Sequence, residues 1–367
     1  MLEGLLQRLH RLREIAADQR ALLAALVAWV PLLVLATDRV SVLRSVAAYG
    51  RFLAAVPILV AAERLLVPRI REAAEQVLHG GLLAPEAQAQ CAARLESLAR
   101  KEGRRTTALA CLALAYALGL WTASEQAALN FVHWARITAG DSTGLSAAGW
   151  WLELVSLPLF WYLLLRHVAR FLAWALFVLK VSRLRWVLHA THPDRMGGIA
   201  FLAEVQADFG YVLFAVGLAL STAWWQVTAE RGMPASAHVQ TAAVYIVGAT
   251  VLPLLPLLAF VPHLRRLRWS GELEYGRLAT RYVRAFDRRW LRAEPAPGDQ
   301  ELLGTPDLQS LADLVNSVNA VRAVQRLPIT RGAALKLVLL AGLAMVPLAL
   351  AAAPLDAILH AVLKALL

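Results

Sequence analysis

The part of the chain richest in side chains that could do chemistry is the segment 188–198, which reads Leu-His-Ala-Thr-His-Pro-Asp-Arg-Met-Gly-Gly. His189, His192 and Asp194 are residue types that bind divalent metals, because imidazole nitrogens and carboxylate oxygens are suitable ligands. Three such groups, with no second cluster elsewhere in the sequence, are too few to predict a metal site. We therefore expect no bound metal here.

The same segment has a structural interpretation that needs no ligand. Pro193 prevents a helix from continuing through it, and Asp194 can cap the helix that follows. Gly197 and Gly198 allow the backbone to approach its neighbours closely. The tripeptide that begins at His192 also matches the J-domain signature, but that domain is a soluble helical hairpin, whereas an apolar run follows here. The sequence predicts a structural turn built from these five residues.

Ionisable residues inside apolar runs form a second group of candidates, because isolated charge in lipid is costly and usually has a function. Asp208 and Glu204 make the first half of the run at 200–227 unusually polar. Glu153 interrupts the preceding run. We treat these three carboxylates as intramembrane candidates. The alternative for Asp208 and Glu204 is that they lie on a cytoplasmic extension of their helix.

No set of residues predicts catalysis. The sequence contains no Gly-x-Ser-x-Gly, Walker loop, Cys-x-x-Cys or His-Glu-x-x-His motif. It also lacks an inverted repeat with matching broken helices, which is typical of many secondary transporters. We expect neither an enzyme nor a bound cofactor.

The composition is that of a multi-pass membrane protein. Of 367 residues, 59% are hydrophobic and only 17% are charged, and the mean hydropathy is +0.55. Soluble domains have about 25% charged residues. The apolar residues fall in runs of about 20, the length that crosses a bilayer. The net charge of +11 then indicates basic cytoplasmic segments rather than a nucleic-acid partner.

The predicted fold class is an all-α integral membrane protein with seven transmembrane helices. The N-terminus lies inside and the C-terminus outside, and spans four and six continue as cytoplasmic helical extensions. The predicted segments are an interfacial amphipathic helix (1–20), spans one and two (21–67), a cytoplasmic helical hairpin (68–104), spans three to six (105–262, with the cytoplasmic extension 166–198), a cytoplasmic helical region (263–331), span seven (332–353) and a C-terminal amphipathic helix (354–367).

The orientation follows from the distribution of basic residues. With the N-terminus inside, 29 of the 37 Lys and Arg residues fall in cytoplasmic segments and five fall outside. This asymmetry is the positive-inside signal. Several tryptophans fall at predicted outer ends, where an aromatic belt forms. We expect contacts with membrane lipids.

Two resemblances add to this interpretation. The segment 191–198 resembles a Thr-His-Pro-Asp-Arg-x-Gly-Gly signature of bacterial multi-pass membrane proteins, which implies a bacterial inner-membrane location but no activity. The predicted topology is similar to that of the insect odorant and gustatory receptors and their distant relatives, which are tetrameric cation channels. That resemblance implies a homo-oligomer, a tetramer by analogy, with a small-molecule ligand of unknown identity. It covers the chain as topology only, so no residue is carried over by motif.

In that family the last span lines the pore. Lys336, Leu340, Leu343 and Pro347 recur at intervals of four, three and four residues, so they share one helical face. A ring of such leucines in a symmetric oligomer could form a gate that closes by dewetting. The alternative is that the same stripe packs against spans five and six.

The function predicted first is an oligomeric, ligand-gated, cation-conducting ion channel. The alternatives are a transporter or lipid-handling protein, and a non-conducting scaffold or sensor. A polar stripe through the spans would favour transport, and an oligomer with a central cavity would favour a channel. Uniformly apolar, tightly packed spans in a monomer would favour the scaffold.

Overall fold

The computed structural model describes residues 2–102, 105–128, 133–139, 142–292 and 306–352. Within them the chain is mostly helical, as the sequence predicts, with one short hairpin of two antiparallel strands and an irregular segment at 182–200. Four helical stretches are long and apolar enough to cross a membrane. They are Arg105–Glu125, Ala147–Val181, Phe201–Arg231 and Ser236–Leu291. A shorter apolar helix covers Gln19–Leu35.

The elements follow one another in a simple order. The first half contains α1 (Leu2–Leu35), α2 (Arg39–Arg44), α3 (Val46–Ala48), the π-helical η1 (Tyr49–Ala55), α4 (Val56–His79), α5 (Pro85–Glu102), α6 (Arg105–Ala128), the 3₁₀ turn η2 (His133–Ala135), β1 (Arg136–Ala139) and β2 (Ser142–Leu145). The second half contains α7 (Ala147–Trp151), the π-helical η3 (Leu152–Ser156), α8 (Leu157–Val181), α9 (Phe201–Asp208), α10 (Gly210–Arg231), η4 (Ala235–His238), α11 (Val239–Val251), the 3₁₀ segment η5 (Leu252–Phe260), α12 (Val261–Phe286), η6 (Asp287–Leu291), α13 (Pro306–Arg322), α14 (Arg331–Ala344) and α15 (Val346–Ala352).

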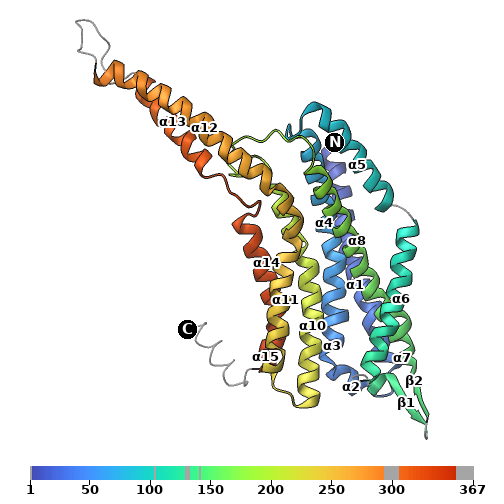
Figure 1. Cartoon of the computed structure of the whole chain (residues 1–367). Coiled ribbons are helices and arrows are strands. Elements are labelled where there is room, and N and C mark those ends of the chain that lie inside the picture. The colour runs from blue at the N-terminus through green and yellow to red at the C-terminus, as the bar shows by residue number, and fades with distance from the viewer. Residues whose placement is uncertain (1, 103–104, 129–132, 140–141, 293–305, 353–367) are drawn as a thin grey trace.

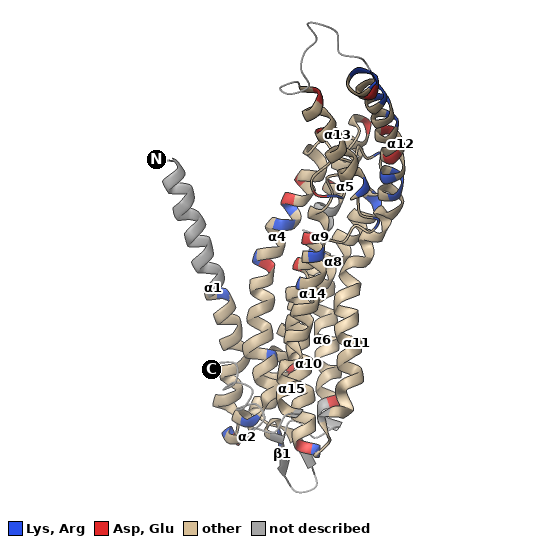
Figure 2. Ribbon diagram, turned by 90° about the vertical axis from the view of Figure 1, so that its left-hand side faces the viewer, with Lys and Arg blue, Asp and Glu red and all other residues tan. Residues whose placement is uncertain are grey.

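The long helices run side by side as an elongated bundle (Figure 1). The strands β1 and β2 lie at one end with α2, and we call this the hairpin end. The helices α5, α12 and α13 lie at the other, which we call the α13 end. Figure 2 shows Lys, Arg, Asp and Glu concentrated at the α13 end, with few along the bundle. The three segments predicted to be cytoplasmic therefore gather at one end.

Small residues let the helices approach closely. A Cβ atom on Gly50 in η1 would lie 2.0 Å from Thr222 Oγ1 in α10. One on Gly217 in α10 would lie 2.5 Å from the Cβ of Ala344 in α14. Close contacts between small residues are typical of membrane helices. Because lipid is as apolar as the helix surface, such helices associate through close packing and not through the hydrophobic effect.

Several of the long helices are irregular. The π-helical segments η1 and η3 interrupt two of them, and η5 carries Pro253 and Pro256 within a 3₁₀ stretch. Proline lacks an N–H and cannot continue an α-helical hydrogen-bond ladder, which explains the change at η5. Turns at Phe209 and Met345 separate α9 from α10 and α14 from α15. The sequence analysis did not predict these interruptions.

Two local features were not predicted, and one predicted segment lies outside the described residues. The amphipathic segment 1–20 and the first apolar run form one helix, α1, because no helix breaker separates them. The strands β1 and β2 pair with each other in an antiparallel hairpin, which the sequence analysis did not predict. The predicted C-terminal helix 354–367 falls outside the described part of the chain.

Candidate functional site

The turn at Asp194 is held together by its carboxylate. One oxygen accepts from the backbone N–H of Met196 at 2.8 Å, and the other accepts from that of Ala200 at 3.1 Å. The N–H of Gly198 lies 3.1 Å from both oxygens. His192 Nδ1 lies 2.8 Å from the first oxygen. A single side chain therefore satisfies three backbone donors.

The structure corrects the expected role of Asp194 as a helix cap. The N-cap of α9 is Ala200, six residues later, and Asp194 instead organises the loop before it. Burial opposes ionisation of Asp194, but the three backbone donors and His192 together lower the pKa of its carboxyl below the usual value. The charged form is thus the one that the turn stabilises.

The backbone of this turn requires its glycines. Gly197 and Gly198 have φ angles of 71° and 103°, a region that side chains with a Cβ rarely adopt. A Cβ on Gly197 would lie 2.7 Å from Leu267 of α12, and one on Gly198 would lie 2.8 Å from Leu82. The N–H of Gln325, just after α13, donates to the carbonyl of Arg195 at 2.8 Å. The turn therefore joins the segment before α5 to α12 and α13.

Metal binding gains no support from this geometry. Across the described ranges, no three His, Cys, Asp or Glu side chains group as a metal site would require. His189 and His192 are both exposed, and Asp194 is already occupied by backbone donors.

Asp208, the second predicted candidate, lies in a cluster of charges at the end of α9. Lys336 of α14 donates a hydrogen bond to one of its oxygens. Arg69 of α4 lies 3.9 Å from the other oxygen. The Lys336 ammonium also sits 4.6 Å from the centre of the Tyr211 ring, a cation–π contact. Sequence analysis predicted Asp208 as an intramembrane carboxylate and Lys336 as part of the pore stripe. The structure shows that the two side chains form an ion pair.

Glu204 lies one turn before Asp208 and is exposed. Its carboxylate accepts a hydrogen bond of 2.7 Å from the Thr330 hydroxyl, which in turn accepts from the backbone N–H of Ala333 and caps α14. Between the two carboxylates, the side chain of Gln206 is fully buried, and both of its amide atoms lack a hydrogen-bond partner. A buried amide without hydrogen-bond partners lowers the stability of the folded protein, so Gln206 is destabilising at this position in α9.

A third cluster was missed by sequence analysis. Glu63 of α4 accepts from Arg166 at 2.6 Å and from Arg170 at 3.0 Å, both on α8. His167, which is 2% exposed, donates through Nε2 to the carbonyl of Leu59 at 2.8 Å, and its Nδ1 lies 3.4 Å from Arg170. The sequence analysis did not connect these residues with one another. The acidic Glu63 and the basic Arg166 lie at similar depths in two apolar runs, and this match could have predicted their ion pair.

The predicted pore stripe has mixed surroundings. Lys336 is engaged with Asp208, and Leu340 contacts the backbone of α10 at Gly210. Leu343 points away from the chain and is 55% exposed, while Pro347 is half-buried. The helix α14 packs against α10 and α11 through a different face, which contains Ala333, Leu337, Ala341 and Ala344.

Glu153, the remaining candidate, lies in η3 and is half-buried. Among the described residues, no hydrogen bond or ion pair joins it to Asp208 or Glu204, which lie in α9. The three carboxylates do not form one site.

No family model matches the chain, and no curated protein or solved structure is significantly similar to it. Its function must therefore be inferred from its own geometry. The two charged clusters differ in position but share one property: each has two basic groups around one carboxylate. Such clusters can hold an anionic group or exchange partners when helices move.

Proposed function

We propose that the bundle crosses a membrane seven times, with the α13 end in the cytoplasm. The four long apolar helices support the membrane location. The segments that contain most of the Lys and Arg residues meet at the α13 end, and basic residues prefer the cytoplasmic side. The bacterial inner membrane is the location we propose, on the resemblance described above.

We propose that the protein transports a small solute with an anionic group through the interior of a single chain. The observation that carries this proposal is the pair of charged clusters between the helices of the bundle, in which Arg170 and Asp208 are mostly buried and Arg69 is exposed. Arg166 and Arg170 surround Glu63, and Lys336 and Arg69 surround Asp208. Glu63, Asp208 and Lys336 lie in predicted spans, where ionisable residues are rare and mark solute or ion pathways. Arg69, Arg166 and Arg170 lie at the start of segments predicted to be cytoplasmic.

The sign of these charges favours anions. Each cluster has one more positive than negative group, and basic linings suit anion pathways, as acidic linings suit cation pathways. The same balance disfavours the cation conduction that the chemoreceptor resemblance implies. Among the hypotheses from sequence, transport therefore takes precedence over the cation channel.

The ion pairs of the two clusters also provide a way to close the solute pathway between the helices. Along α4 they lie between η1 and the α13 end, and their ion pairs link α4 to α8 and α9 to α14. An anionic solute that pairs with Arg170 would compete with Glu63 and weaken the link between α4 and α8. The irregular segments η1, η3 and η5 provide places where these helices can bend.

The test is uptake of labelled anions and cations of matched size into proteoliposomes that contain the purified protein. We expect uptake of at least one anion, reduced at least tenfold in Arg170→Gln. Arg71→Gln is the matched control on α4, because Arg71 is exposed and makes only a surface pair with Glu75. Uptake of cations alone, or equal uptake by both variants, would contradict the proposal.

The oligomeric channel remains a second candidate because of one observation. The helix α14 presents an apolar face that the described chain leaves exposed, with Leu339 and Leu343 60% and 55% exposed. In a symmetric oligomer this face would line a shared path. Leu343→Ser should then raise the basal conductance in planar bilayers, because a polar ring retains water. Unchanged currents from a folded oligomer would remove α14 from any pore.

A further inference from the structure

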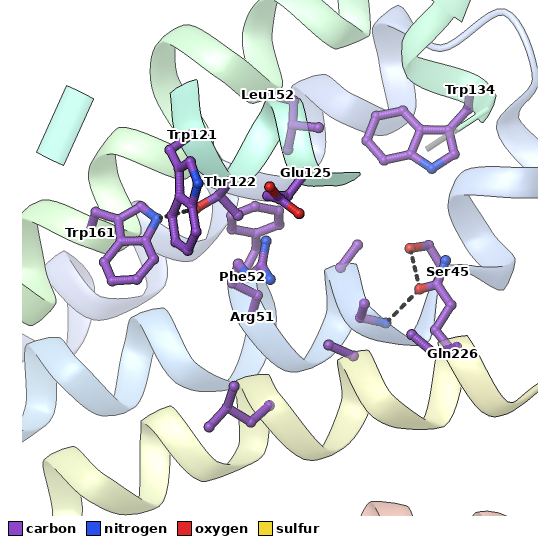
Figure 3. A pocket seen from close by; sticks show the side chains of 15 residues that line it. Ser45, Arg51, Phe52, Trp121, Thr122, Glu125, Trp134, Leu152, Trp161 and Gln226 are labelled. Atoms are coloured by element: carbon purple, nitrogen blue, oxygen red, sulfur yellow. Dashed lines mark hydrogen bonds between the residues drawn. The ribbon is translucent and has the colours of Figure 1, made fainter. Parts of the chain in front are cut away.

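A cavity opens at the hairpin end of the bundle, separate from the charged clusters. It has a volume of about 450 Å³, within the range of small-molecule sites. Its walls come from η1, α6, η3 and α10, so the π-helical segments η1 and η3 both border it (Figure 3). Such π-helical segments are frequent at functional sites.

The lining combines apolar rings with one half-buried positive charge. Arg51 and Phe52 come from η1, Trp121 comes from α6, and Trp161 comes from α8. Trp161 donates to the Thr122 hydroxyl at 3.0 Å, which fixes its ring at the wall. The Arg51 guanidinium lies 5.8 Å from the centre of the Phe160 ring, so it is set among aromatic side chains rather than at the surface.

The environment of Trp134 is a second, independent observation that indicates a ligand. Its side chain lines the cavity and is only 4% exposed, yet its indole N–H has no hydrogen-bond partner among the described residues. In Figure 3 the indole nitrogen lies on the ring edge nearer Ser45. An aromatic belt at a membrane surface would account for Trp121, which is 59% exposed, but not for a buried tryptophan with an unsatisfied donor.

We infer that this cavity binds a small organic acid, a carboxylate on an apolar body. The carboxylate would pair with Arg51, because a guanidinium matches carboxylate geometry, and the apolar body would lie against the rings. The free N–H of Trp134 offers another donor on the same wall. This inference rests on the proposed transport of anionic solutes and names their class.

The negative group in the lining is compatible with such a ligand. Glu125 is exposed, so water screens its charge, whereas Arg51 sits deeper among aromatic rings. A cationic ligand would have to place its charge beside Arg51. A neutral apolar ligand would leave the Trp134 donor without an acceptor.

The experiment is isothermal titration calorimetry on the full-length protein in nanodiscs, with phenylacetate as the probe. Acetate retains the charge without the ring, and phenylacetamide retains the ring without the charge. We expect phenylacetate to bind at least tenfold more tightly than either. Laurate, added to the nanodisc lipid, tests whether the acid comes from the membrane instead of the water.

Two variants locate the binding. Arg51→Gln should weaken phenylacetate or laurate binding at least tenfold, because a charge-assisted pair is lost. Arg39→Gln, an exposed arginine at the same end, should leave it unchanged. If Arg51→Gln does not fold, Trp134→Phe should weaken binding several-fold, because it keeps the ring and removes only the N–H.

Each outcome is decisive. Binding of either acid that depends on Arg51 or Trp134 supports the site, and the tighter of the two identifies the source of the ligand. Binding of neither acid, or equal binding of phenylacetamide, overturns the inference. Arg51-dependent binding without uptake into proteoliposomes would refute the transport proposal but support the binding site. Uptake of an anion without binding of either acid would support transport but refute the binding site.

Discussion

Replacing Asp194 by alanine should destabilise the protein by about 3 kcal/mol. The substitution leaves the N–H groups of Met196, Gly198 and Ala200 without their acceptor. Each lost bond costs about 1 kcal/mol net. Loss of a single helix cap, the role expected from sequence, would cost only about 1 kcal/mol. The measured value therefore distinguishes the observed turn from a simple cap.

The assay is unfolding by denaturant in mild detergent, combined with hydrogen exchange of the loop amides. The N–H groups of 196, 198 and 200 should exchange slowly in the wild-type protein and quickly in Asp194→Ala. Asp194→Asn retains one acceptor oxygen and should cost about half as much as alanine. Equal stability of Asp194→Ala and wild type, with unchanged exchange, would refute the reasoning.

The effect should also depend on pH. The pKa of the Asp194 carboxyl is lowered in the folded protein, so its stabilisation is complete above the unfolded value of about 3.9. It is lost as the pH falls through the lower folded-state pKa. The stability difference between wild type and Asp194→Ala should therefore be constant at neutral pH and shrink below about pH 4.

Three further predictions follow from the packing and the charges. Lys336→Met alone should destabilise the protein by about 2 kcal/mol because it leaves Asp208 without its closest partner, and adding Asp208→Asn should restore part of the loss in denaturant unfolding. Gly50→Ala should lower the thermal midpoint in detergent strongly, since its Cβ would overlap α10; a midpoint near that of wild type would disprove this contact. Of single cysteines in a Cys-free background, Gly144→Cys should react with an impermeant thiol reagent in intact cells and Gly276→Cys only after lysis, and the reverse pattern would invert the orientation.

The helical architecture was predictable because apolar runs of membrane length are a strong signal. The run at 105–123 became α6, and the runs that begin near 150, 200 and 240 became the other long apolar helices. The interruptions were not predictable in the same way. A π-helical turn such as η1 reflects packing against α10 around Gly50, which no local pattern reveals.

The candidate site was predictable only in part. Asp208 and Lys336 were singled out because charge in an apolar run is conspicuous, but 128 positions separate them, so their pairing needed the fold. Glu63 and Arg166 lie 103 positions apart, and the sequence analysis did not connect them. The cavity at the hairpin end was not predicted, because its aromatic residues come from several helices and resemble an interfacial belt.

The measurement that tests the transport proposal most directly is cysteine accessibility around Glu63, in a protein that lacks Cys91 and Cys111. Single cysteines replace the buried Leu59, Ala62 and Leu66, and one replaces the exposed Leu65 of the same helix. Anionic and cationic methanethiosulfonate reagents are compared, with rates normalised to Gly144→Cys. Transport of anions predicts that the three interior cysteines react, faster with the anionic reagent, while Leu65→Cys stays unreactive in lipid. Interior cysteines that react with neither reagent, or faster with the cationic one, would contradict it.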